Sequence, residues 1–278
     1  MKKKSILILS LIITALILIA GCTPTTPTTG IIEVNSTPTG AKIYLDGVDT
    51  GMATPFTKTN VEAGSHVIKL DAFHYKIWED TVIVIANETT YINPLLTYAT
   101  QSTITLQPDA EGIDSTVETA FPDNNYGIWP ITAVGNSAST IIRMYIEFDL
   151  SSIPADVRIT EADLKLYQYS TNGTDNFTIG LYKITSDWEE NTIDWDSQPT
   201  SSTDAEITNN ITAGATTWES WGIDTLVQGW LDGTITNYGM VLKDTDESSD
   251  NTIAYFFTSD YTIDTTKCPK LEIDYYIP

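Results

Sequence analysis

The side chains best placed to do chemistry lie on the polar faces of two alternating segments. In residues 143–148, Arg143, Tyr145 and Glu147 alternate with apolar side chains. Side chains two apart share one face of a strand, so these three are predicted to point away from the core. Together they can bind hydroxyl or carboxylate groups and stack on an apolar ring. The alternative is that Arg143 pairs with Glu147 or another acid and simply holds the sheet.

A second segment of the same kind follows at residues 164–167. There Leu164 and Leu166 alternate with Lys165 and Tyr167, so Lys165 and Tyr167 are also predicted to face away from the core. If the polar faces of both segments line one concave sheet, they form a shelf suited to a sugar chain. The candidate glycan-binding residues are therefore Arg143, Tyr145, Glu147, Lys165 and Tyr167.

An acidic segment at residues 244–251 is the candidate metal site. Its carboxylates are Asp244, Asp246, Glu247 and Asp250. Calcium, a hard cation, prefers such oxygen ligands, so calcium is the one cofactor that the sequence suggests. The segment lacks the glycine and the terminal glutamate spacing of an EF-hand loop, and the alternative is a solvated surface loop.

Catalysis has little support in the sequence. Both histidines, His66 and His74, precede residue 98, and the later part of the chain holds one cysteine, Cys268. Serine–histidine–aspartate, cysteine–histidine and zinc mechanisms are thereby excluded within residues 98–278. A two-carboxylate mechanism is not excluded by composition, but no pair of acids stands out. We predict that the protein is not an enzyme.

The charge limits the partners. The chain has 37 acidic and 14 basic residues, a formal net charge of -23, which excludes a nucleic-acid binder. Residues 98–278 hold 29 acids and 7 bases, a net of -22. A polyanion would need a local basic patch or bridging calcium, because remote charge is screened beyond ~8 Å. A neutral or calcium-bridged glycan therefore fits as well as an acidic one.

The first residues have the pattern of a targeting signal. Three lysines at positions 2–4 precede an apolar run that ends in Ala20, Gly21 and Cys22. This ending resembles a lipobox, which implies cleavage of a signal peptide of residues 1–21 and a lipid on Cys22. An uncleaved transmembrane anchor is the alternative. Either interpretation predicts an extracytoplasmic protein, and the first predicts a lipid-anchored one at the cell surface. A Thr/Pro linker of residues 22–29 follows.

Residues 30–97 are predicted to form a small β domain. Strand patterns at 31–34, 41–45, 66–70 and 81–85 are separated by the hairpin signals Asp46-Gly47 and Ala63-Gly64. The segment resembles a PEGA domain in residues 34–41 (VNSTPTGA), 43–47 (IYLDG) and 62–68 (EAGSHVI), and departs from it at Thr39. The resemblance implies a small β-sandwich that serves as a spacer or adhesive module. His66 is predicted to be structural.

Residues 102–278 are predicted to form one larger, jelly-roll-like β-sandwich. Strand patterns recur at 104–106, 144–148, 164–167, 177–182, 238–242, 254–257 and 271–275. The one helix candidate is residues 225–231, capped by Asp224. Among the tryptophans, Trp129, Trp218 and Trp221 are better candidates for exposure than Trp188 and Trp195.

This second unit resembles the DNRLRE family, which is carbohydrate-binding module family 96. The matching segments are 125–127 (NYG), 143–154 (RMYIEFDLSSIP), 188–195 (WEENTIDW), 227–230 (VQGW) and 237–240 (NYGM). The resemblance implies a β-sandwich that attaches secreted or surface proteins to polysaccharide, with acidic glycans such as alginate among its targets.

The sequence thus predicts an all-β lipoprotein, a small PEGA-type β-sandwich followed by a jelly-roll-like one that binds polysaccharide. The competing prediction is a structural envelope or adhesion protein that makes protein–protein contacts and binds no glycan.

Overall fold

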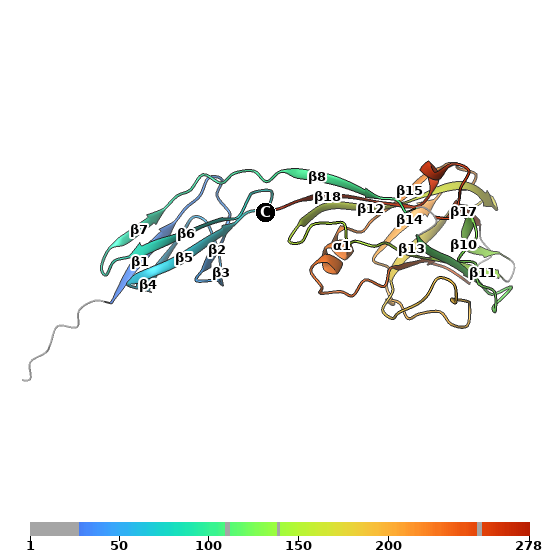
Figure 1. Cartoon of the computed structure of the whole chain (residues 1–278), viewed down its shortest axis with the longest axis horizontal. Coiled ribbons are helices and arrows are strands. Elements are labelled where there is room, and N and C mark those ends of the chain that lie inside the picture. Colours follow the sequence, from blue (N-terminus) through green and yellow to red (C-terminus); the bar gives the residue numbers. More distant parts are fainter. Residues whose placement is uncertain (1–27, 109–111, 138–139, 249–251) are drawn as a thin grey trace, which may run out of the picture.

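The predicted all-β fold is confirmed. The computed structural model describes residues 28–108, 112–137, 140–248 and 252–278, which form two β domains placed end to end (Figure 1). The predicted signal peptide, Cys22 and Asp250 lie outside the described residues. Within the described residues, no helix is long and apolar enough to span a membrane.

The N-terminal domain is a sandwich of two sheets. Its strands are β1 (Thr29–Val34), β2 (Lys42–Leu45), β3 (Val48–Ala53), β4 (Phe56–Glu62), β5 (Gly64–Asp71), β6 (Trp78–Val84) and β7 (Thr89–Ile92). Among the described residues, one sheet has the order β4-β1-β7 and the other β3-β2-β5-β6. Ile32 and Val34 of the first sheet share a buried core with Ile43, Ile68 and Leu70 of the second. Alternating apolar residues on both inner faces therefore hold the two sheets together.

The two predicted hairpin signals have different outcomes. Asp46 and Gly47 both have positive φ, 50° and 80°, and they connect the paired strands β2 and β3 as predicted. The Ala63-Gly64 prediction is wrong, because β4 and β5 belong to different sheets and the turn crosses between them. His66 has the structural role expected of it. Its Nδ1 lies 2.7 Å from a carboxylate oxygen of Asp46, and its Nε2 lies 2.9 Å from the carbonyl oxygen of Glu62.

The C-terminal domain is a larger curled sandwich. Its elements are β8 (Gln101–Leu106), β9 (Ile113–Glu118), β10 (Ile131–Ser137), β11 (Thr140–Glu147), β12 (Arg158–Asn172), β13 (Phe177–Lys183), β14 (Ile207–Ile211), β15 (Thr217–Gly222), α1 (Asp224–Leu231), β16 (Met240–Asp244), β17 (Ile253–Phe257), η1 (Thr265–Lys267) and β18 (Lys270–Tyr276). The described strands follow the order β14-β13-β16-β11-β10-β17-β12-β18-β8, with β9 paired to β11 and β15 paired to β12.

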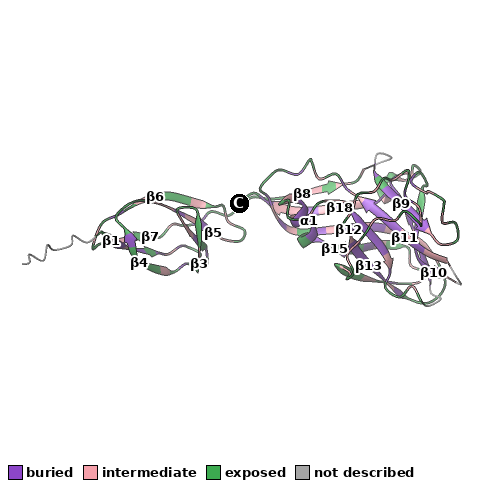
Figure 2. Ribbon diagram, turned by 90° about the horizontal axis from the view of Figure 1, so that it is seen from below, coloured by how far each residue is buried: buried purple, intermediate pink, exposed green. Residues whose placement is uncertain are grey.

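This ladder encloses one apolar core. Met144 and Ile146 of β11 share that core with Leu164 and Leu166 of β12, and with side chains of β13, β16, β17 and β18. Figure 2 shows that β9, β11 and β13 are largely buried. All seven strand patterns predicted for this domain correspond to strands of the structure.

The helix begins one residue earlier than predicted. Ile223 is the N-cap, and Asp224 is the first helical residue rather than the cap. Its carboxylate still lies in the first turn, where the helix dipole favours negative charge. Leu226, Val227 and Trp230 are buried, so the helix closes the end of the core that faces the N-terminal domain (Figure 1).

Specific contacts join the two domains. Arg158 Nη1 donates to a carboxylate oxygen of Asp71 at 2.7 Å, and Arg158 Nη2 donates to the other oxygen. The backbone amide of His74 donates to the Tyr276 hydroxyl at 3.0 Å, and the rings of Phe73, His74 and Tyr276 cluster around this bond. Because β8 begins at residue 101 and pairs with β18, the chain passes from one domain into the sheet of the other without a long linker.

Candidate functional site

The first group of predicted binding residues lies on β11 beneath a long loop. Arg143 Nε and Nη2 donate to the two carboxylate oxygens of Glu247 at 2.7 and 2.6 Å, while Nη1 donates to Gln198 Oε1 at 2.7 Å. The Tyr145 hydroxyl donates to the same oxygen at 2.9 Å. Tyr145 is only 2% exposed, and burial raises its pKa to about 12. Glu147 follows on the same strand, and its pKa is raised by burial and by the nearby carboxylates of Asp187 and Asp149.

The loop over this face is residues 185–206, here called the covering segment. Ile193 of this segment packs with Tyr145 in a small second core, and Trp188 and Trp195 pack against it. The Arg143 guanidinium carbon lies 4.8 Å from the centre of the Trp195 ring. Arg143 therefore holds the covering segment on the sheet, which is the structural alternative that the sequence left open, with Glu247 as the acid.

The second group, Lys165 and Tyr167, lies on the opposite side of the domain. Leu164 and Leu166 of β12 point into the same core as Met144 and Ile146 of β11, so the polar faces of the two strands point in opposite directions. The expectation that they line one concave sheet is wrong. The alternation of side chains along a strand shows which residues share a face of that strand. It does not show whether two strands lie side by side or on opposite sides of the core.

Around Tyr167 the structure assembles a row of rings that the sequence did not reveal. Tyr167 of β12 is the cross-strand partner of Trp218 on β15, with ring centres 5.4 Å apart. Phe257 of β17 stacks at 6.1 Å from Tyr167, 4.6 Å from Tyr169 and 3.7 Å from Tyr261. Tyr255 continues the row at 6.2 Å from Tyr169. We call these six residues the aromatic face, made of Tyr167, Tyr169, Trp218, Tyr255, Phe257 and Tyr261.

Each ring of the aromatic face is half-buried and points away from the core. Lys267 lies 5.0 Å above the Tyr167 ring, and Lys270 lies 4.6 Å above the Trp218 ring. Lys165 and Lys270 both bond the Glu272 carboxylate beside the face, the second at 2.7 Å. The arrangement combines aromatic rings with lysines over two of them and a carboxylate beside them, groups through which a protein can stack on a sugar and hydrogen-bond to it.

The comparisons with known proteins point to the same class of ligand, a carbohydrate. Residues 102–274 match carbohydrate-binding module family 96, and residues 29–98 match the PEGA domain. The chain belongs to carbohydrate-binding module family 96. Membership indicates carbohydrate binding, and both matched families are non-catalytic modules. The predicted order of a PEGA domain before a family 96 domain is confirmed. No curated protein matches the chain.

Of the three tryptophans favoured for exposure, Trp129 is 49% exposed and Trp218 is half-buried. The predicted exposure of Trp221 is wrong. Its side chain is fully buried in the core of the family 96 domain, and its Nε1 donates to the carbonyl oxygen of Ile179 at 3.2 Å. Period-two aromatic pairs, Tyr167 with Tyr169 and Tyr255 with Phe257, were the signal in the sequence that could have found the aromatic face.

The predicted calcium residues are engaged within the family 96 domain. An oxygen of the buried Asp244 accepts from the Asp246 amide at 2.9 Å, and an Asp246 oxygen accepts from the Ser248 amide and hydroxyl. Glu247 carries the ion pair with Arg143. Among the described residues, no group of three or more histidine, cysteine or acidic side chains is placed to hold a metal ion, and Asp250 is outside them. Calcium binding stays a prediction.

One buried carboxyl of the family 96 domain has a strongly altered pKa. Asp114, on β9, is 2% exposed, and burial raises its pKa to about 7 despite hydrogen bonding by Ser259. Its Oδ2 accepts from the Ser259 amide at 2.9 Å, and its own amide donates to Glu190 at 3.0 Å. The ionised form of Asp114 is therefore disfavoured in the folded domain, so this carboxyl makes stability depend on pH.

Another hollow lies at the domain junction rather than at the aromatic face. It measures about 760 Å³, and Arg158, Gln228 and Ile277 are among its lining. The described residues that line it include no aromatic ring, so it offers no stacking surface for a sugar.

Proposed function

We propose that this protein is a cell-surface lipoprotein that binds extracellular polysaccharide through the aromatic face of its family 96 domain. The observation that carries the proposal is the row of rings from Trp218 through Tyr167 to Tyr255. Six adjacent half-buried rings on an outer surface of the domain form an aromatic surface for a sugar chain, and family membership supports the same ligand class.

The charge around the aromatic face favours a neutral chain or one bridged by calcium. Lys270 is paired with Glu272 at 2.7 Å, and Lys267 with Asp264 at 3.3 Å. These lysines are already neutralised, so an acidic glycan would have to displace their partners against the net negative charge of the domain.

The N-terminal part of the chain serves as anchor and spacer in this proposal. Lipid on Cys22 would hold the protein at the membrane, and residues 23–29 in an extended form would reach ~20 Å at ~3.1 Å per residue. The PEGA domain adds its own length, and the Arg158–Asp71 pair at the junction keeps the two domains in line. Binding would then occur well away from the membrane surface.

The test is binding of the chain without residues 1–21, carrying Cys22→Ser, to neutral and acidic polysaccharides with and without calcium. Tyr167→Ala and Trp218→Ala should each weaken binding about 5- to 30-fold, because removing a contacting ring typically costs about 1–2 kcal/mol. Tyr91→Ala is the matched control, since Tyr91 is an exposed tyrosine of the PEGA domain.

Absence of binding to every polysaccharide would overturn the proposal and favour the protein–protein alternative. Release of reducing ends from a bound polysaccharide would show enzymatic activity, which the proposal excludes. Calcium-dependent binding that is lost in Asp246→Asn would assign calcium to the acidic segment.

A further inference from the structure

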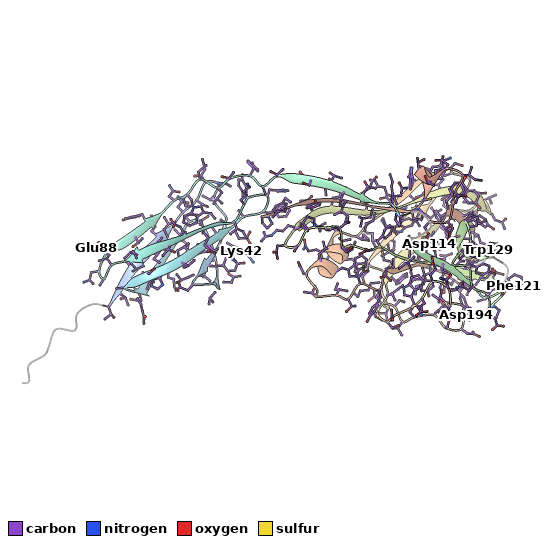
Figure 3. The ribbon with its side chains drawn as sticks, in the orientation of Figure 1. Lys42, Glu88, Asp114, Phe121, Trp129 and Asp194 are labelled. Carbon is purple, nitrogen blue, oxygen red and sulfur yellow. The ribbon has the colours of Figure 1, made fainter. Side chains whose placement is uncertain are left out.

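A second hollow, open to the surface, lies at the end of the family 96 domain farthest from the PEGA domain. It measures about 220 Å³, and strands β9, β10, β11 and β17 contribute to its lining together with residues 126 and 129 of the β9–β10 loop. Figure 3 places Trp129 and Phe121 at this end of the molecule. Neither the family match nor the aromatic face accounts for a hollow here.

The floor of the hollow is closed. Thr116, Thr132, Ala133 and Ile142 line it, and each is no more than 9% exposed. The hydroxyls of Thr116 and Thr132 are 2.6 Å apart and hydrogen-bonded to each other. A ligand can therefore enter from the rim, but it cannot pass through the hollow.

The rim combines ring faces with polar groups. Trp129 packs edge-on against Tyr126, with ring centres 5.2 Å apart. The Tyr126 hydroxyl donates to Glu118 and accepts from Asn124 Nδ2 at 3.3 Å. The Thr258 hydroxyl donates to the carbonyl oxygen of Trp129 at 2.5 Å, which fixes the backbone under the indole. Rings beside a carboxylate and hydroxyls suit a sugar unit, which has an apolar face and a polar circumference.

The hollow is continuous with the aromatic face. Tyr255 belongs to both, because it lines the hollow and lies 6.2 Å from Tyr169. Strand pairing places Ile131 of the rim directly opposite Phe257. A glycan chain that lies along the aromatic face would therefore reach this hollow at Tyr255.

We propose that the family 96 domain recognises the end of a glycan chain, with the terminal sugar in this hollow and the next units on the aromatic face. This inference rests on the proposed function. The volume, about 220 Å³, is below the ~300–1,000 Å³ of pockets for drug-sized ligands, so the hollow takes one sugar ring rather than an oligosaccharide. A unit seated on the floor can be continued along the aromatic face through Tyr255 but not through the floor, an arrangement that suits a chain end.

The experiment uses a polysaccharide that the protein binds, cut to a series of average chain lengths and presented at equal mass. End recognition predicts that the amount of protein bound at saturation rises in proportion to the number of chain ends. Trp129→Ala should lower affinity about tenfold or more, the effect of removing a central contact residue. Phe121→Ala is the matched control, because Phe121 is 57% exposed at the same end of the domain but is not among the residues that line the hollow. Thermal unfolding of each variant establishes that it is folded.

The failure of this inference is distinct from failure of the proposed function. Saturation that follows the mass of polysaccharide regardless of chain length would overturn end recognition alone. Binding lost in Tyr167→Ala but unchanged in folded Trp129→Ala would also overturn it and leave the aromatic face as the site. No binding to any polysaccharide would overturn both proposals.

Discussion

Replacing Asp114 with asparagine should stabilise the protein above pH 7 and change little near pH 4. Asp114 is 2% exposed, and burial raises its pKa from 3.8 to about 7. The hydrogen bond from the Ser259 amide favours the charged form of Asp114 and offsets only part of the increase in pKa. The nearby carboxylates of Glu190 and Asp260 raise the pKa further. Asparagine has the shape of the protonated acid and keeps an oxygen to accept from Ser259.

The sign follows from proton binding. Between pH 3.8 and about 7 the folded protein holds a proton on Asp114 that the unfolded chain has released, so this group makes stability fall as pH rises. The contribution of the Asp114 carboxyl to the free energy of unfolding is fully present below pH 3.8 and is lost as pH rises through about 7. At about 1.4 kcal/mol per pH unit, the loss approaches about 4 kcal/mol as an upper bound. The asparagine variant has no such loss.

Urea unfolding of wild type and Asp114→Asn from pH 4 to pH 8 measures this difference directly. The variant should gain stability over wild type as pH rises, with most of the gain between pH 4 and 7. Other carboxyl groups of the domain also titrate, so the difference between the two proteins is the quantity that counts. Asp123→Asn, at an exposed aspartate, is the control. A difference that does not change with pH, or that favours wild type at pH 8, would refute the reasoning.

Three further predictions concern the junction, the covering segment and the anchor. Arg158→Ala leaves the buried Asp71 carboxylate without this partner. We expect the free energy of unfolding to fall by about 1–3 kcal/mol, an effect limited by the partial exposure of Arg158. X-ray scattering should show a broader distribution of interdomain distances, and an unchanged scattering profile would contradict this prediction. Arg143→Ala removes the ion pair with Glu247 and should speed amide hydrogen exchange in residues 185–206, while glycan affinity retained in this variant would support the aromatic face over Arg143 as the binding site. Cys22→Ser should move the protein from the membrane fraction to the soluble fraction and abolish incorporation of labelled fatty acid, whereas a variant still in the membrane would favour the transmembrane alternative.

Alternation predicted much of the fold because each buried strand keeps its apolar side chains on one face. The seven strand patterns of the family 96 domain were found in this way. Strands such as β3 and β4 were missed because most of their side chains are exposed, so they carry no apolar period and are held by backbone pairing. The Asp46-Gly47 turn was predictable because its backbone requires positive φ at both residues.

The sequence by itself determined the all-β class, the order of the two domains and the face of its own strand to which each side chain points. Only the tertiary structure decided which faces meet. It placed Arg143 and Lys165 on opposite sides of one core, buried Trp221, and brought Trp218, Tyr167 and Phe257 together from three strands. The physical reason is that parity is a local property of one strand, whereas the partner across a sheet or a core is set by long-range pairing that a single segment does not encode.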